Sequence, residues 1–591
     1  MGCVSLVRRP WFVLILFGLL ILITRWPLAP GQFFAFDDVN LAYAVGHYDI
    51  RMSQPQPPGY PLFVLEMRVL HWLRVKRVES ILLILALAGS IAALVLLVFA
   101  GNRILGGDSG FWAAWVMLLH PVFWHSGVAS ALRVQLAVVS VAVAMCCWRA
   151  WIGDGRWVKW SAIVLAVGAG IRPETGPLLF PLWAVCAWRA KAPRPEIGRA
   201  LAWMAGVVLV WLLPAMIASG GPMDFVRANL DYVSDQASVS SGLFGATEGR
   251  WVTTLWRLIV WVFCGVLAWG LPAALAFRRK DWFGIPRTRL AFLALWLLPP
   301  LIFALTVHLE DPGQTLAMIP VVCLVGGFVV ERAIDNASLG LTRFLAPICI
   351  GAGFFAGRIY DKDQSLFTVQ WLTVLCLAVG VALRIAPIPS RDFAPKPLVI
   401  ALVLTPLLVL NYTFFYNPGW YYKGSAASGF EGFLEQAWAE INTGFSLTSL
   451  QQIKSTLAVD DPTLREMRRL IGERPADTIV IWERGLTAWR KAAYYAPGTQ
   501  IVVLEHKKIR SSPPVVVIWR GTTLERQLQG GTPLRVQVPA GARIVWLLNP
   551  GTDFYQETKR NFPLTAAGPV WFTDLPRESG SRQLGEDELF W

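Results

Sequence analysis

Residues 36–62 read FDDVNLAYAVGHYDIRMSQPQPPGYPL. Two adjacent carboxylates, Asp37 and Asp38, come directly after the first long apolar segment of the chain. A Gln-Pro-Pro-Gly-Tyr-Pro turn at 56–61 then opens another apolar segment. Charges at a membrane boundary are costly unless they are solvated or used. The position of these two carboxylates therefore indicates chemistry rather than packing.

The composition is that of a polytopic membrane protein. Apolar residues make up 55% of the chain and charged residues 16%, and the mean hydropathy is +0.50. These values exclude an ordinary soluble protein, and the 29 tryptophans suit bilayer interfaces. The net charge of +14 comes largely from Lys and Arg in short loops between apolar segments. It therefore indicates membrane orientation, not binding of nucleic acid.

Residues 1–415 contain about thirteen apolar runs that could cross a bilayer, at roughly 20 residues for a full span. An odd number of spans places the two termini on opposite sides of the membrane. The predicted spans are 11–29, 79–100, 111–126, 131–150, 158–171, 175–188, 200–218, 252–276, 290–307, 315–331, 344–357, 366–387 and 397–415.

Basic loops set the orientation. Five of them fall on one side of this count, which the positive-inside rule makes cytoplasmic; they lie at 8–9, 149–159, 189–199, 278–289 and 384–396. We therefore expect a cytoplasmic N-terminus, an outward loop at 30–78 and an outward C-terminal domain. The short apolar run at 60–74 contains Glu66 and Arg68, so we expect a helix along the outer membrane surface.

Residues 416–591 mix polar and apolar residues, in contrast to the apolar runs before them, and they predict a smaller extracytoplasmic α/β domain. Their patterns predict five strands and two helices. The strands are expected at 476–482, 500–505, 514–519, 533–538 and 542–548, and the helices at 446–472 and 485–496. The whole chain is thus expected to be a polytopic all-α membrane domain followed by this α/β domain.

Metal sites and disulfides have little support in the sequence. All eight cysteines precede residue 415, mostly within apolar runs, and none has the spacing of metal ligands. His308, Glu310 and Asp311 share one loop, which is weak evidence for a metal, because a solvated loop has the same composition. We predict no specific cofactor, and the sequence leaves open whether the protein binds a divalent cation.

The outward carboxylates have two interpretations. An aspartate just outside the membrane can act as general base toward an acceptor or can hold a cation. Alternatively, Asp38 caps the helix that follows it, and both can hold at once. The turn at Pro57 and Pro58 opens a helix whose N-terminal N–H groups suit a phosphate.

The order of first span, paired acids, short helix and Pro-Pro turn resembles the GT-C superfamily of membrane glycosyltransferases. That superfamily includes protein O-mannosyltransferases and aminoarabinose transferases, and PPGYPLF is most similar to a branch with His-Pro-Pro-Gly-Tyr-Pro-Leu at this turn. The resemblance implies a sugar donor on polyprenyl phosphate, a protein, lipid or glycan acceptor, and transfer on the outer face of a bacterial inner membrane. It implies that Asp37, beside Asp38, is the base and that the anomeric centre is inverted.

The same resemblance implies a substrate site around the turn and the outer loops. A leaving phosphate needs positive partners. The candidate substrate-binding residues are Gln56, Pro58, Tyr60, Arg133, Arg172, Glu174 and His308. Three positions depart from the family pattern: Gln56 stands where Lys or His is usual, Arg133 lies in a loop that often carries a second acid, and Gln314 replaces an aromatic residue.

Other interpretations stay open. Arg172 and Glu174 could form a self-satisfied ion pair in a turn instead of a phosphate site. Trp482, Trp489, Tyr494 and Tyr495 could stack on sugars or fill the core of the tail. At the level of the whole protein, the rivals are a transporter or lipid flippase, and a non-catalytic glycan-assembly scaffold of GT-C descent. No internal repeat typical of transporters is visible.

Overall fold

The computed structural model divides into two compact units. A helical unit comprises Met1–Gly31 and Tyr60–Ile453, and an α/β unit comprises Gln32–Gly59 and Lys454–Trp591. The structure describes residues 9–190, 193–240, 250–266, 284–307, 309–335, 345–353, 378, 396–416, 443–472, 475–483, 489–505, 515–520, 523–528, 536–548, 555–556, 559–560, 562–567, 570–575 and 582–584. The α/β unit thus includes the loop with Asp37 and Asp38, whereas the sequence suggested domains at 1–415 and 416–591. Those domain boundaries stay a prediction.

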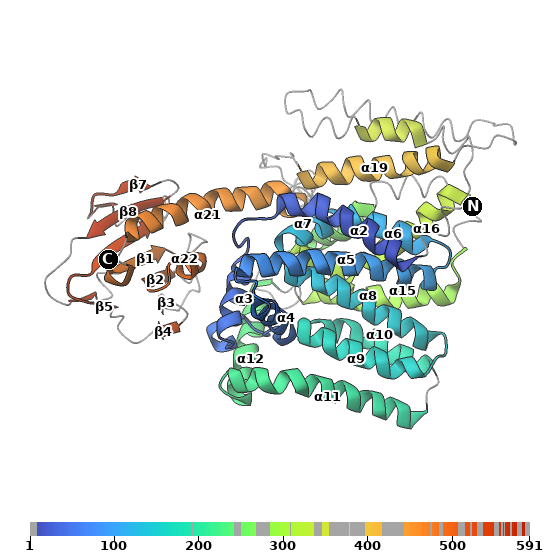
Figure 1. Ribbon diagram of the computed structural model, residues 1–591, viewed down its shortest axis with the longest axis horizontal. Coiled ribbons are helices and arrows are strands. Elements are labelled where there is room, and N and C mark those ends of the chain that lie inside the picture. Colours follow the sequence, from blue (N-terminus) through green and yellow to red (C-terminus); the bar gives the residue numbers. More distant parts are fainter. Residues whose placement is uncertain are drawn as a thin grey trace. The chain divides into compact units, whose positions relative to one another are not determined.

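The described part of the helical unit is built of helices, several of them long and apolar (Figure 1). Its elements are α2 (Pro10–Arg25), η1 (Trp26–Leu28), α4 (Pro61–Trp72), α5 (Val78–Ile104), α6 (Ser109–Leu118), α7 (Pro121–Ala129), α8 (Ala131–Trp151), α9 (Arg156–Ile171), α10 (Thr175–Arg189), α11 (Arg194–Ala218), α12 (Pro222–Ser240), α13 (Arg250–Leu258), η3 (Ile259–Cys264), α15 (Arg287–Thr306), η5 (Pro312–Ala317), α16 (Ile319–Asp335) and α19 (Lys396–Tyr416). Within it, α8 packs against both α5 and α9, and α9 packs against α11.

Six helices among the described residues are long and apolar enough to cross a membrane. They are Pro10–Leu28, Val78–Ile104, Ala131–Trp151, Arg194–Ala218, Arg287–Thr306 and Pro397–Tyr416. Some predicted spans are shorter helices, such as α9 and α10, and the one at 366–387 lies almost wholly outside the described residues. The span predicted at 111–126 is interrupted, since α6 ends at Leu118 and α7 begins at Pro121. The total of about thirteen therefore stays a prediction.

Glycines allow three of these helices to approach closely. A Cβ built on Gly101 of α5 would lie 2.5 Å from the Cα of Gly110 in α6. A Cβ on Gly327 of α16 would lie 2.3 Å from the backbone nitrogen of Ala113. Small residues at such crossings let helix backbones pack tightly where no hydrophobic effect drives association. The packing of α5, α6 and α16 thus depends on these positions.

The α/β unit is built on a seven-stranded sheet in the order β4-β3-β2-β1-β6-β8-β7. β1 pairs in parallel with β2 and β6, and the remaining neighbours pair antiparallel. The strands are β1 (Thr478–Glu483), β2 (Gln500–Glu505), β3 (Val515–Arg520), β4 (Thr523–Leu528), β6 (Arg543–Leu548), β7 (Thr565–Ala567) and β8 (Val570–Leu575), with β5 (Val536–Val538) paired separately to β9 (Arg582–Leu584).

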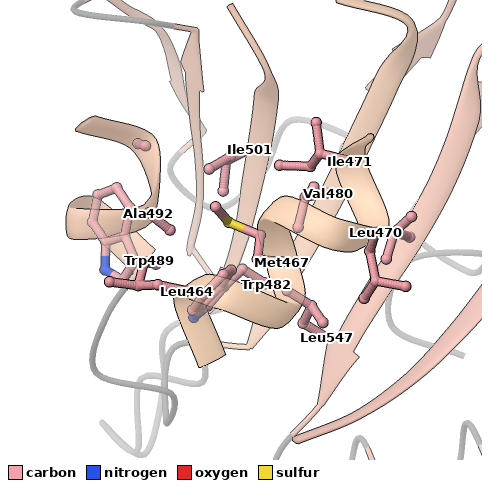
Figure 2. Packing of buried hydrophobic residues seen from close by; sticks show 12 residues of the cluster. Leu464, Met467, Leu470, Ile471, Val480, Trp482, Trp489, Ala492, Ile501 and Leu547 are labelled. Atoms are coloured by element: carbon pink, nitrogen blue, oxygen red, sulfur yellow. The ribbon is translucent and has the colours of Figure 1, made fainter. Parts of the chain in front are cut away.

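Five helical segments complete the described part of this unit. They are α3 (Phe36–Gly46), η2 (Ile50–Met52), α21 (Leu450–Ile471) and α22 (Trp489–Tyr495), with the short η6 (Pro475–Asp477) before β1. The apolar side of α21 packs on the central strands, where Met467 lies among Val480, Trp482 and Ile501 (Figure 2). The elements predicted for the tail from alternation and periodicity are present near their expected positions.

Candidate functional site

The two carboxylates lie in the first turn of α3. The backbone N–H of Ala35 donates to Oδ2 of Asp38 over 3.0 Å, so Asp38 caps the helix from its third position rather than from the N-cap. Carboxylates in the first turn also interact favourably with the positive end of the helix dipole. Asp38 is 6% exposed, whereas Asp37 is half-buried. The capping alternative therefore describes Asp38, and Asp37 is the more accessible of the two.

Burial changes the proton affinity of Asp38. The pKa of its carboxyl is raised to about 7, mainly by desolvation and in smaller part by the neighbouring negative charge of Asp37. The Ala35 N–H and the positive charge of Lys491 lower the pKa, but they do not offset the effect of burial. The loop therefore holds a carboxyl that exchanges its proton near neutral pH beside a more accessible carboxylate.

Helix α22 brings a buried arginine to the same loop. Nη2 of Arg490 donates to the carbonyl oxygens of Met52 and Ser53 over 3.1 and 2.9 Å. Its guanidinium also lies 5.5 Å from the ring centroid of Phe36 and 5.4 Å from that of Tyr43. Burial lowers the pKa of Arg490 to about 9, against the opposing effects of Tyr43 and Asp37. Arg490 therefore supplies positive charge that interacts with Asp37.

Lys491, the next residue of α22, pairs with Asp460 of α21. Both side chains are buried, and Nζ of Lys491 donates to Oδ2 of Asp460. Breaking such a pair by removing one partner leaves a buried charge without compensation. This ion pair thus fixes the position of a cation close to the carboxylates of α3.

A pocket of about 470 Å³ lies between α3, α21 and α22, beside the first turn of α3. Its polar lining comes from the Lys491–Asp460 ion pair and from the hydroxyls of two residues of α21, and the rest of the lining is mainly apolar. The lining residues are Phe34, Ala35, Phe36, Val39, Ser455, Thr456, Asp460 and Lys491. A pocket with few convergent polar groups beside a carboxyl of raised pKa has the character of a binding site.

The tail aromatics pack on other protein groups. Tyr494 and Tyr495 lie with ring centroids 5.1 and 5.8 Å from Phe33, and Trp489 lies 5.8 Å from Phe36. Trp482 is fully buried in the core on β1. This geometry matches the interpretation of these four residues as core aromatics. Their contacts with Phe33 and Phe36 also attach the segment before α3 to the tail within the α/β unit.

The Gln-Pro-Pro-Gly turn is tightly built. The carbonyl of Gln56 accepts from the N–H of Gly59 over 3.1 Å, and Pro57–Pro58 is a cis peptide. Gly59 has φ +110°, and a Cβ there would lie 2.4 Å from Oη of Tyr48, so only glycine fits. Gln56 is buried, and its Oε1 has no hydrogen-bond partner among the described residues.

The helix after the turn begins at Pro61, with buried Tyr60 as its N-cap at φ 45°. It covers Pro61–Trp72, close to the surface helix predicted at 60–74. The helix therefore starts three residues after Pro58, because the positive φ values of Gly59 and Tyr60 separate the proline pair from it.

Two arginines predicted to lie in outer loops are paired with carboxylates in the helical unit. Arg172 is buried, its Nη2 lies 2.5 Å from Oε1 of Glu174, and its Nη1 donates to the carbonyl of Leu132 over 3.4 Å. Arg133 lies 3.4 Å from Oδ1 of Asp311. The geometry of Arg172 and Glu174 is that of the ion-pair alternative. His308 lies outside the described residues.

The predicted site residues divide between the two units. Asp37, Asp38, Gln56 and Pro58 belong to the α/β unit. The helical unit holds Tyr60, Arg133, Arg172 and Glu174. Within the described residues, no group of three His, Cys, Asp or Glu side chains could hold a metal.

Sequence reasoning missed Arg490, Lys491 and Asp460. A signal was available for the first two, because TAWRKAAYYA places adjacent cations in an otherwise apolar helix. Buried cations in such a helix need partners. Their partner Asp460 precedes them by about thirty positions and could not be identified from spacing.

Comparisons with known proteins show what the fold resembles. The sequence matches no protein-family model, and no curated protein matches it. The structure is similar to that of ArnT from Cupriavidus metallidurans bound to undecaprenyl phosphate, with a TM-score of 0.50 and 13% identity over 97% of this chain and 98% of that one. The apo state of the same protein gives a TM-score of 0.53 and 14% identity over 95% and 97% of the two chains.

This similarity covers nearly the full length of both chains, so it includes the α/β part as well as the helices. At 13–14% identity it shows a fold like that of ArnT. Together with the six apolar helices, it identifies the chain as an integral membrane protein of the ArnT-like fold.

Proposed function

We propose that this protein is a membrane glycosyltransferase that moves a sugar from a polyprenyl-phosphate donor to an acceptor on the outer face of the membrane. The observation that carries the proposal is that Asp38 interacts electrostatically with both Asp37 and Lys491, beside a pocket that Lys491 and the first turn of α3 line. A fold shared with ArnT over nearly the full length of both chains supports the lipid-linked donor, since ArnT was solved with undecaprenyl phosphate. Fold by itself does not define an activity.

In the proposed reaction, Asp37 is the general base. Its carboxylate accepts the proton of the acceptor hydroxyl or amine while that oxygen or nitrogen bonds to the anomeric carbon. The bond from this carbon to the phosphate oxygen breaks, the phosphate leaves with the electron pair, and the anomeric centre is inverted. Asp37 is chosen over Asp38 because Asp38 is buried and already accepts a hydrogen bond from Ala35.

The leaving phosphate requires positive charge. Gln56 carries none, and Arg172 is already paired with Glu174. The resemblance names Arg133 and His308 as candidates for this role, and Arg133 has a half-exposed partner in Asp311. The donor sugar and the acceptor are not specified by these residues, but the PPGYP turn favours the branch of the superfamily that carries this motif.

The test is sugar transfer by the purified full chain in lipid nanodiscs, with polyprenyl-phosphate sugars extracted from host membranes as donors. Loss of a general base costs roughly 10²- to 10⁴-fold, so Asp37→Asn should reduce transfer by at least two orders of magnitude. Asp38→Asn should retain transfer. Asp154→Asn, in the 149–159 loop, is the matched control and should retain full activity.

Three outcomes would count against the proposal. Full transfer by both Asp37→Asn and Asp38→Asn would refute the base assignment. Lipid or solute movement by reconstituted protein without any sugar transfer would favour a transporter or flippase. Absence of both activities, with binding of a glycan or glycolipid retained, would favour a non-catalytic scaffold.

The proposed orientation has its own test. A reporter active only in the periplasm, fused after residue 420, should be active if the N-terminus is cytoplasmic and the tail faces outward. A silent fusion at that position, with expression shown by immunoblot, would overturn the orientation and the assignment to the outer face of the inner membrane.

A further inference from the structure

Arg25 is a buried cation near the end of the first apolar helix. It is the last residue of α2, within the candidate span Pro10–Leu28, and its side chain is 0% exposed. A charged residue in such a helix is expensive and marks a functional site unless a partner neutralises it. The partners of Arg25 therefore decide what it does.

Every partner of Arg25 among the described residues is neutral. Its Nη2 donates to the carbonyl of Leu118 over 2.5 Å, and its Nη1 donates to Oγ1 of Thr24 over 2.7 Å. The guanidinium lies 4.9 Å from the ring centroid of Trp124. Its Nε has no hydrogen-bond partner there, and no carboxylate pairs with it in that part of the chain. Among the described residues, the positive charge thus has no carboxylate as its counter-charge.

Arg25 lines a pocket of about 350 Å³ inside the helical unit. The lining comes from α2, η1, α6, α7 and α19 and is mainly apolar and aromatic. The lining residues are Leu20, Ile23, Thr24, Arg25, Pro27, Leu28, Trp115, Leu118, Leu119, Trp124, Leu408, Tyr412 and Tyr416.

The rim of this pocket is apolar and exposed. Ile23 is 69% exposed, Leu408 48% and Tyr412 41%, and they belong to the candidate spans of α2 and α19. Exposed apolar side chains on spanning helices face hydrocarbon. The pocket therefore joins a lipid-facing surface to a buried guanidinium.

Two tyrosines add hydrogen-bond donors to the same pocket. The rings of Tyr412 and Tyr416 stack at 4.3 Å, and Tyr416 also meets the Trp124 ring edge-on at 5.8 Å. Neither tyrosine hydroxyl is hydrogen-bonded within the described residues. A guanidinium with phenolic hydroxyls provides donors for the oxygens of a phosphate.

We propose that this pocket binds the phosphate headgroup of a membrane lipid, with Arg25 as the charge partner and the lipid chain running out over Ile23 and Leu408. An anion compensates the buried cation, and an apolar chain fits the apolar rim. The ligand is thus a lipid phosphate, from either a glycerophospholipid or a polyprenyl phosphate. The inference rests on the membrane-spanning helices and does not depend on sugar transfer.

The experiment measures saturable binding to the delipidated full chain in neutral detergent, by native mass spectrometry. The probes are phosphatidylglycerol, a polyprenyl phosphate, the corresponding uncharged prenol and inorganic phosphate alone. Binding of one or both lipid phosphates, at least ten-fold tighter than the prenol and inorganic phosphate, is expected. The tighter of the two lipid probes identifies the source of the headgroup.

Variants separate a binding site from a purely structural arginine. Arg25→Gln should weaken lipid-phosphate binding at least ten-fold, Arg25→Lys should retain most of it, and Arg156→Gln at an exposed arginine should leave it unchanged. Leu408→Trp adds bulk to the apolar lining of the pocket and leaves the Arg25 side chain unchanged. It should also abolish binding, and it provides the test if Arg25→Gln fails to fold. Equal binding by wild type and Leu408→Trp would overturn the proposal, as would prenol or inorganic phosphate binding as tightly as the lipid phosphates.

Discussion

The raised pKa of Asp38 predicts how the protein responds to pH. In the unfolded chain this carboxyl ionises near pH 3.8, whereas burial in the folded protein moves its pKa to about 7. Between these values the folded state binds more protons than the unfolded state, so the free energy of unfolding falls as pH rises. Asp38→Asn removes the titrating group and should therefore remove this part of the pH dependence.

The magnitude follows from the size of the shift. Each pKa unit corresponds to 1.36 kcal/mol, so a shift of about three units corresponds to about 4 kcal/mol. The stabilisation that comes from keeping the Asp38 carboxyl protonated is complete below about pH 4 and is lost as the pH rises through about 7. At pH 4 the wild type and Asp38→Asn should have similar stability, because the wild-type carboxyl is then neutral in both states. At pH 8 the variant should be the more stable by up to about 4 kcal/mol, less any weakening of the cap from Ala35.

The assay is thermal unfolding of the detergent-purified full chain at half-unit steps from pH 4 to 8, followed by tryptophan fluorescence. For a unit of this size, about 4 kcal/mol corresponds to roughly 10 °C in the midpoint. Asp37→Asn is an informative companion, because loss of the neighbouring charge should move the transition to lower pH. Parallel curves for the wild type and Asp38→Asn would refute the argument that burial controls this carboxyl.

Three further predictions test the packing of the α/β unit. Lys491→Gln should lower the free energy of unfolding by about 3–5 kcal/mol, since it leaves Asp460 buried without its partner; Lys491→Gln with Asp460→Asn should recover part of the loss in thermal melts. Arg490→Gln should raise amide hydrogen exchange at least ten-fold in residues 49–54, because this segment loses two hydrogen bonds to a charged group, each of about 1.5–3 kcal/mol. Exchange equal to that of the wild type would contradict the bonding described. Met467→Ala should cost about 2–5 kcal/mol as a core cavity, and a loss under 1 kcal/mol in the same melts would mean that the site collapses.

The membrane character and the order of elements could be read from the sequence because they depend on local properties. Apolar runs of sufficient length predict spanning helices whatever their neighbours are. Alternation along 500–505 and 542–548 likewise predicts strands that β2 and β6 then occupy. The span expected at 111–126 was less predictable, because a break at 119–120 barely changes the average hydropathy.

Only the acidic residues of the candidate site could be predicted from the sequence. Asp37 and Asp38 are conspicuous in sequence because charge follows an apolar run, and their interpretation as cap or base needed no knowledge of distant residues. Arg490 and Lys491 follow them by some 450 positions, and only folding within the α/β unit brings these cations to the loop. The same holds for Arg25, which the sequence places at the end of a span without indicating that it lines a pocket.

By itself the sequence determined that this is a membrane protein with an α/β tail and an acidic first loop, since hydrophobic length, alternation and charge position act locally. Only the tertiary structure decided that Asp38 is buried and caps α3 while Asp37 stays accessible, that Arg172 is paired with Glu174, and that Lys491 lies beside the carboxylates. Burial and pairing depend on residues far apart in the chain, and they control the charge state of each group.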